Sequence, residues 1–162
     1  MKWDKNDLSS LTDYWEGDWA IQRSIPEHSA TLIGVARFQK SGREACRPIL
    51  DYCENGVLTL NKTSETFQAM RRYSFECFSN NVVLFFADGL NIGKVFQNLT
   101  PANNPSSADK QVLIGNHLCV KDNYGTVYEI ADDDHFIVTH HVNGPAKNYT
   151  STTLYFRSPL TA

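Results

Sequence analysis

The sequence lacks long apolar stretches, an excess of basic residues and paired cysteine motifs. Its longest fully apolar run, from Val82 to Ala87, is six residues long, whereas a membrane-spanning helix needs about 20. The net charge of −3 argues against a nucleic-acid partner, which selects for a basic surface. No C-x-x-C pair occurs among the four cysteines, so thiols in a reducing compartment are favoured over a disulfide framework or a zinc site.

Motifs for nucleotide cofactors and serine hydrolysis are also missing. The sequence contains no G-x-G-x-x-G, no P-loop and no G-x-S-x-G. His140 and His141 are adjacent, and neighbouring strand residues point to opposite faces, so they are poorly placed to share a metal. We therefore expect no cofactor and no metal.

What remains is a chain of 162 residues, of which 41% are hydrophobic, 20% charged and 12% aromatic. This length fits one domain over residues 1–162 with a single core. The first residues, Met-Lys-Trp-Asp-Lys-Asn-Asp, lack the apolar segment of a secretory signal. Together with the cysteine usage, this predicts a cytoplasmic protein with neither a membrane nor a nucleic-acid partner, and it leaves a homodimer open.

Hydrophobic periodicity predicts a short helix over about residues 5–14 and strands over about residues 15–157. Strand-like segments alternate in polarity and are separated by turn signals such as Glu54-Asn55-Gly56 and Asp88-Gly89. The stretch 100–110 is predicted to be a loop. This spacing favours an all-β protein, an antiparallel barrel of about 8–10 strands, with the helix at one end.

Two features resemble the calycin superfamily of lipocalins and fatty-acid-binding proteins. One is Gly17-Asp18-Trp19 at the start of the first strand, and the other is Arg157 near the end of the last. The resemblance implies that Arg157 packs across Trp19 and closes the bottom of a calycin-like barrel. A guanidinium on an indole face contributes roughly 0.5–2 kcal/mol.

Nearly the whole chain also resembles an uncharacterised family of small bacterial and fungal barrels, a domain of unknown function. The resemblance rests on short segments spread along the chain, from Gly17-x-Trp19 through Phe67-x-Ala69-x-Arg71-Arg72-Tyr73 and Phe86-Ala87-Asp88-Gly89 to Tyr155-x-Arg157. One departure is Phe96-Gln97, where the family pattern has Phe-His. The family implies a fold and no activity.

Charged side chains share strand faces with apolar ones. Arg23 follows Trp19 and Ile21 in phase, Arg71 lies between Ala69 and Tyr73, and Glu54 follows Leu50 and Tyr52. Two interpretations stay open. Glu54 forms an internal ion pair with Arg23 or Arg71 that fixes strand register, or the group forms a pocket for an anionic or oxygen-rich small molecule. The predicted ligand-binding residues are Arg23, Tyr52, Arg71, Tyr73, Phe75 and Lys147.

A second group combines His117, Asp122 and Tyr124, which with Glu54 are the candidate catalytic residues. His117 could act as general base, with Asp122 fixing its tautomer. Strict alternation, however, places His117 on a different face from Asp122 and Tyr124 unless a bulge intervenes.

The sequence supports two functions. The first is a cofactor-independent enzyme, of isomerase, cyclase, dehydratase or lyase type, acting on a small oxygenated or anionic metabolite inside the barrel. Arg71 and Arg23 would hold the substrate, and Glu54 or His117 would move a proton. The second is a non-catalytic barrel that binds an amphipathic organic acid or other small hydrophobic ligand.

Overall fold

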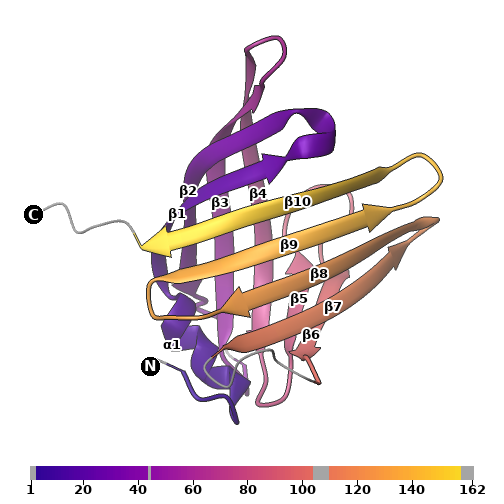
Figure 1. Cartoon of the computed structure of the whole chain (residues 1–162). Coiled ribbons are helices and arrows are strands. Elements are labelled where there is room, and N and C mark those ends of the chain that lie inside the picture. The colour runs from indigo at the N-terminus through magenta and orange to yellow at the C-terminus, as the bar shows by residue number, and fades with distance from the viewer. Residues whose placement is uncertain (1–2, 44, 104–109, 158–162) are drawn as a thin grey trace, which may run out of the picture.

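The chain folds into a closed antiparallel β-barrel of ten strands (Figure 1). The computed structural model describes residues 3–43, 45–103 and 110–157. Each strand pairs with its neighbours in the chain, and β1 pairs with β10 to close the barrel. The predicted all-β class is therefore confirmed. The strands are β1 (Gly17–Ile25), β2 (Ala30–Lys40), β3 (Ile49–Leu60), β4 (Glu65–Cys77), β5 (Val82–Phe86), β6 (Val95–Pro101), β7 (Gln111–Cys119), β8 (Asp122–Ile130), β9 (His135–Asn143) and β10 (Asn148–Arg157).

The N-terminal helical segment is shorter than predicted. It consists of a 3-10 turn η1 (Leu8–Ser10), continued by one α-helical turn α1 (Leu11–Trp15), and a second 3-10 turn η2 (Pro26–His28) joins β1 to β2. No helix among the described residues is long and apolar enough to cross a membrane. The predicted loop at 100–110 begins later than expected, because β6 runs to Pro101, and residues 104–109 lie outside the described residues.

The prediction of a hairpin at Glu54-Asn55-Gly56 is wrong. These residues lie within β3, which pairs with β2 on one side and with β4 on the other. Gly56 instead allows two strands to approach closely. Gly56 pairs with Gly34 of β2. A Cβ added at Gly34 would lie 2.1 Å from the carbonyl oxygen of Asn55. Glycine in a strand often marks such a close backbone approach.

The helix α1 lies beneath one end of the barrel (Figure 1). Buried aromatic side chains fill this end. Trp15 of α1 is fully buried, with its ring 5.5 Å from Phe75 and 5.8 Å from Phe38. Phe136 of β9 packs 4.8 Å from Trp19. Large aromatic side chains contribute most of the apolar area in such a core, so this end of the barrel is solid.

Arg157 fastens α1 to the barrel wall. Its guanidinium carbon lies 3.8 Å from the ring centroid of Trp19, and its amino groups donate to the carbonyls of Tyr14 and Glu16. Gly17 has a φ of +115°, and an added Cβ there would lie 3.0 Å from Arg157 Nη1. The strand can therefore start beside this guanidinium only with glycine at position 17.

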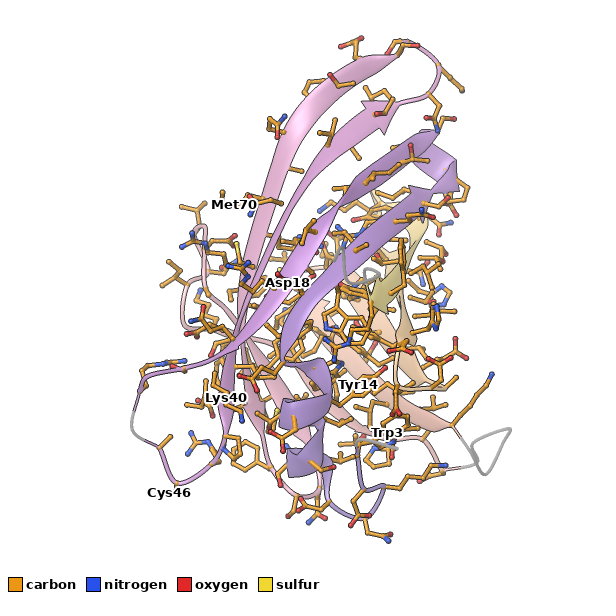
Figure 2. The ribbon with its side chains drawn as sticks, turned by 90° about the vertical axis from the view of Figure 1, so that its left-hand side faces the viewer. Trp3, Tyr14, Asp18, Lys40, Cys46 and Met70 are labelled. Carbon is orange, nitrogen blue, oxygen red and sulfur yellow. The ribbon has the colours of Figure 1, made fainter. Side chains whose placement is uncertain are left out.

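The opposite end is open. The β3–β4 hairpin extends beyond the other strands there (Figure 1). Its outer part stands clear of the barrel, and Met70 lies near its base in the view of Figure 2. β4 pairs with β5 only from Tyr73 to Cys77, so the wall is incomplete above Tyr73 and access to the interior is left open.

Candidate functional site

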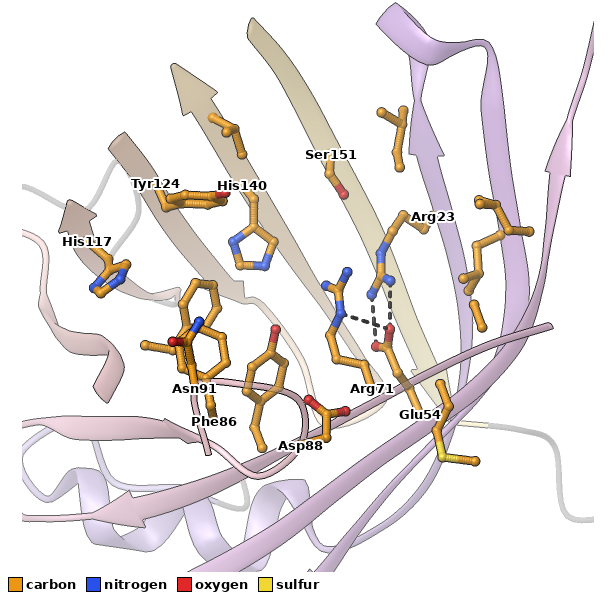
Figure 3. A pocket seen from close by; sticks show the side chains of 18 of the residues that line it. Arg23, Glu54, Arg71, Phe86, Asp88, Asn91, His117, Tyr124, His140 and Ser151 are labelled. Carbon is orange, nitrogen blue, oxygen red and sulfur yellow. Dashed lines mark hydrogen bonds and ion pairs between the residues drawn. The ribbon is translucent and has the colours of Figure 1, made fainter. Parts of the chain in front are cut away.

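The open half of the barrel encloses a cavity of about 490 Å³ (Figure 3). Its lining combines buried charges with aromatic rings from most of the strands. The lining side chains include Arg23, Glu54, Arg71, Tyr73, Phe86, Phe96, His117, Cys119, Tyr124, His140 and Ser151.

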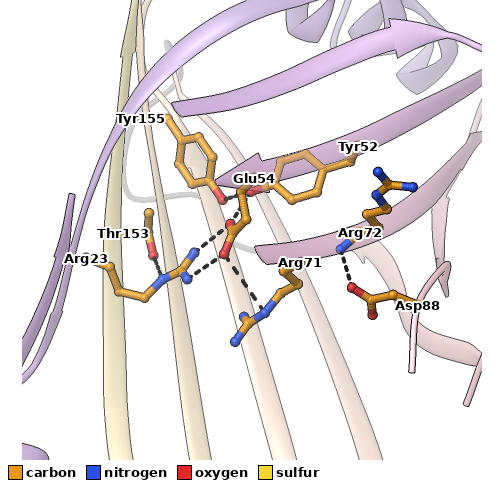
Figure 4. A network of polar contacts seen from close by, with 8 residues as sticks. All are labelled: Arg23, Tyr52, Glu54, Arg71, Arg72, Asp88, Thr153 and Tyr155. Carbon is orange, nitrogen blue, oxygen red and sulfur yellow. Dashed lines mark hydrogen bonds and ion pairs between the residues drawn. The ribbon is translucent and has the colours of Figure 1, made fainter. Parts of the chain in front are cut away.

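A buried ion pair lies on one side of this cavity (Figure 4). Arg23 of β1 binds Glu54 of β3 through two parallel hydrogen bonds, with Nη1 2.7 Å from Oε1 and Nη2 2.9 Å from Oε2. Both residues are less than a tenth exposed. A third N–H of Arg23, at Nε, donates to Thr153 Oγ1 at 2.7 Å. Bidentate geometry of this kind is what makes a buried pair tolerable.

Two tyrosines complete the surroundings of Glu54. Tyr52 donates its hydroxyl to Glu54 Oε2 at 2.5 Å, and the hydroxyl of Tyr155 lies 2.8 Å from that of Tyr52. Burial alone would raise the pKa of Glu54, but the hydrogen bonds and charge of Arg23 outweigh it and hold that pKa below its usual value. Glu54 is therefore an ionised acceptor whose oxygens are already engaged, which suits a structural role better than proton transfer.

Arg71 differs from Arg23 in that its guanidinium is not held by a close ion pair. Its Nε lies 3.9 Å from Glu54 Oε1, beyond hydrogen-bond distance, and its side chain is 45% exposed. Among the described residues, Glu54 is the one acid within ion-pair distance of it. Because Arg23 already neutralises Glu54, these three side chains carry a net charge of +1. Figure 3 shows Arg71 beside that pair, on the side facing the cavity.

Aromatic rings form the wall beyond Arg71. Phe96 stacks on Tyr73 with centroids 5.2 Å apart and planes 11° apart, and Phe86 lies 5.0 Å from Phe96. His117 packs edge-on against Phe96 at 5.9 Å. The cavity is thus lined by charged side chains at one side, Arg23, Glu54, Arg71 and Asp88, and by aromatic rings at the other.

His140 also lines the cavity, a position that was not predicted from the sequence. Its Nδ1 lies 2.9 Å from Thr126 Oγ1. Burial, followed by the charges of Arg71 and Arg23, lowers the pKa of His140 to about 3, so its imidazole is neutral at physiological pH. Phe136, Val138 and His140 alternate along β9, and this alternation predicts that the His140 side chain points into the barrel.

His141 points the other way, with Nδ1 3.1 Å from Thr150 Oγ1. The expectation that two adjacent histidines face opposite sides of the strand therefore agrees with the structure. Within the described ranges, no group of three or more metal-ligating side chains is assembled.

The phase argument that separated His117 from Tyr124 is wrong. A two-residue turn, Val120-Lys121, joins β7 to β8, so His117 pairs directly with Tyr124 and Cys119 with Asp122. Directly opposed residues of an antiparallel pair lie on the same face, and both His117 and Tyr124 line the cavity. The alternation of inward and outward side chains holds along one strand, and it cannot be extrapolated across a turn to the next strand.

Asp122 and Lys147 are not among the described residues that line the cavity. Lys147 Nζ lies 3.6 Å from Asp122 Oδ2 and donates to the hydroxyl of Tyr124 at 3.3 Å. Asp122 is thus engaged with Lys147, and its role in fixing the tautomer of His117 stays a prediction. The Lys147–Asp122 pair is only partly buried.

Tyr52 and Phe75, two predicted ligand contacts, lie deeper than the cavity. Phe75 is 1% exposed and packs against Trp15 in the closed end. Tyr52 is 4% exposed, and its hydroxyl donates to Glu54 Oε2. The inward phase of both residues was predicted correctly, but the sequence does not show at what depth the barrel interior changes from solid core to cavity.

Fold and site together define a small antiparallel barrel with an arginine-bearing internal cavity. The chain belongs to a family of unknown function, DUF6314, whose model matches residues 15–157. A search of the curated proteins gave no match.

Among solved structures, the chain is similar to the S-type phycobiliprotein lyase CPES from Guillardia theta. The TM-score is 0.65 at 7% sequence identity, and the match covers 94% of this chain and 93% of that one. At this identity the similarity shows a shared fold.

Proposed function

We propose that this protein binds a small organic acid inside its barrel and that Arg71 receives the acid group. The observation that carries the proposal is the incomplete set of partners around Arg71. Its guanidinium faces the cavity, and its nearest acid, Glu54, is 3.9 Å away and already bound in a bidentate pair by Arg23. A guanidinium fork matches a carboxylate through two parallel, charge-assisted hydrogen bonds.

The aromatic wall favours a ligand with a flat, unsaturated body. Tyr73, Phe86 and Phe96 present ring faces and edges to the cavity, and such surfaces stack on conjugated groups. The volume of about 490 Å³ falls in the range of roughly 300–1,000 Å³ typical of small-molecule sites. Neutral His140 and the Ser151 hydroxyl add polar contacts near Arg71.

The comparisons are compatible with this proposal. The neighbour from Guillardia theta is named as an S-type phycobiliprotein lyase, so a protein with this barrel architecture carries a lyase name. The packing of Arg157 on Trp19 supports a calycin-like interpretation of the barrel. We retain the cytoplasm as the proposed location.

Catalysis of an isomerase, cyclase, dehydratase or lyase type is the second candidate function. It is favoured by the convergence of His117, Tyr124 and His140 on one cavity, since all three carry groups that can donate or accept a proton. Glu54 is not carried into this candidate, because Arg23 and Tyr52 already occupy its oxygens.

The binding proposal is tested with an aromatic anion, 1-anilinonaphthalene-8-sulfonate, whose fluorescence reports entry into an apolar site. Arg71→Met keeps an unbranched apolar side chain and removes the guanidinium with its charge. Arg72→Met is the matched control, because Arg72 is the adjacent exposed arginine and does not line the cavity.

Loss of a charge-assisted hydrogen bond should weaken binding about 10- to 100-fold in Arg71→Met. The Arg72→Met variant should bind as the wild type does, and benzoate should displace the probe better than benzamide. Equal affinities in the two variants would overturn the proposal.

A further inference from the structure

The outer part of β4 is an unpaired strand edge. β4 pairs with β3 along its length, but with β5 only from Tyr73 to Cys77. In the described part of the chain, no strand lies against the other side of β4 between Glu65 and Arg71. Figure 2 shows this hairpin projecting beyond the barrel.

The direction of the free backbone groups follows from Arg72, the residue at which the open edge ends. Its carbonyl accepts from the Ala87 N–H at 3.2 Å, and its own N–H donates to Asp88 Oδ2 at 2.8 Å. Both backbone groups of Arg72 therefore point away from β3. Because this direction alternates along a strand, the N–H and C=O groups of Thr66, Gln68 and Met70 point to the same open side.

This edge lacks the features that normally prevent an exposed strand from pairing with another chain. Residues 66–70, Thr-Phe-Gln-Ala-Met, contain neither charge nor proline, the devices that usually prevent edge-to-edge pairing. Phe67 is 47% exposed and Met70 is 62% exposed. Open donors and acceptors beside exposed apolar side chains are a template for another strand.

We propose that the strand that covers this edge is β4 of a second copy of the chain, paired antiparallel about a two-fold axis at Gln68. In this register Thr66 lies opposite Met70 of the second copy, and Gln68 opposite Gln68, so all the outward-pointing backbone groups are matched. Phe67 lies opposite Ala69. Glu65 lies opposite Arg71, so no like charges face each other along the paired segment.

The chain itself selects this register. An axis at Phe67 would place Lys62 opposite Arg72 and would require pairing through Ser64, whose φ of 61° ends the strand. An axis at Gln68 uses the segment from Glu65 to Arg71 and stops where Asp88 binds the Arg72 backbone. The pairing leaves Arg71 in its cavity, because its side chain is directed toward Glu54 on β3, away from the edge.

A register-specific cross-link tests the pairing, in a Cys46→Ser background that removes the exposed native thiol. Directly opposed residues in a hydrogen-bonded antiparallel pair have Cα atoms about 5.5 Å apart, within disulfide range. Gln68→Cys should therefore form a covalent dimer under mild oxidation. Met70→Cys is the matched control, because its two copies would lie roughly 14 Å apart and should not cross-link.

Sedimentation equilibrium supplies an independent readout. The wild type should be dimeric, and Gln68→Pro should be monomeric with an unchanged circular dichroism spectrum, because the lost N–H faces the open edge and not β3. A monomeric wild type would overturn the proposal. So would cross-linking of Met70→Cys as fast as that of Gln68→Cys, which would reveal a different interface or register.

Discussion

Arg23 of β1 and Glu54 of β3 meet inside the barrel across the intervening strand β2 and form two parallel hydrogen bonds of 2.7 and 2.9 Å. The pair answers one question that the sequence left open, since Glu54 takes Arg23 as its close partner and holds Arg71 at 3.9 Å. A close buried ion pair and a second arginine without a close acidic partner in the described part of the chain thus lie in one cluster.

Replacing Glu54 by Gln should strongly destabilise the protein. The change leaves the Arg23 guanidinium buried without a counter-charge, which typically costs about 3–5 kcal/mol. Urea unfolding measures the loss. Asp18→Asn is the control, because Asp18 pairs with Arg37 at the same 2.7 Å distance but on the exposed surface, where such pairs contribute about 1 kcal/mol or less. Similar losses in both variants would contradict the burial argument.

The pKa of His140 should make stability fall as the solution is acidified. Burial and the two arginines lower this pKa to about 3 in the folded protein, whereas an unfolded histidine titrates near 6.5. The unfolded state therefore binds the proton first, and stability is lost as pH falls from about 6.5 toward 3.

His140→Gln should flatten this part of the stability curve, measured by urea unfolding at a series of pH values. His141→Gln, on the outer face of the same strand, should leave the slope unchanged. An NMR titration in which His140 protonates near pH 6.5 would refute the prediction directly.

Gly34→Ala should disrupt the contact between β2 and β3. An added methyl group would lie 2.1 Å from the carbonyl oxygen of Asn55 and 2.5 Å from Gly56 Cα, so backbone has to move. We expect a clear loss in melting temperature. Gly42→Ala is the control, since an added Cβ there meets nothing within 4 Å, and a loss of equal size in this variant would show that the close approach is unimportant.

Arg157→Met should loosen the attachment of α1. The variant loses the cation–π contact with Trp19, worth roughly 0.5–2 kcal/mol, and the hydrogen bonds to the carbonyls of Tyr14 and Glu16. Thermal unfolding followed by tryptophan fluorescence should show a lower midpoint. Arg37→Met removes a surface arginine and should have little effect. An unchanged midpoint in Arg157→Met would argue against a closing role for this residue.

The barrel could be predicted because strand periodicity depends on local sequence alone, and the inward phases of Arg23, Glu54 and Arg71 followed from it. The hairpin error at Asn55-Gly56 arose because a turn signal and a close strand approach both use glycine. His117 and Tyr124 were predicted to lie on different faces because the alternation of side-chain direction was extended across the turn between β7 and β8, where it does not hold. The depth of Tyr52 and Phe75 depends on how far α1 fills the barrel, which no local pattern encodes.

The most direct test of the Arg71 site is native mass spectrometry of the protein purified from an extract of its own host. We expect the wild type and Arg72→Met to retain a small acidic molecule and the folded Arg71→Met variant to lack it. Retention of the same molecule by Arg71→Met, at the same occupancy as in the wild type, would contradict the assignment of Arg71 as the anchor of the cavity.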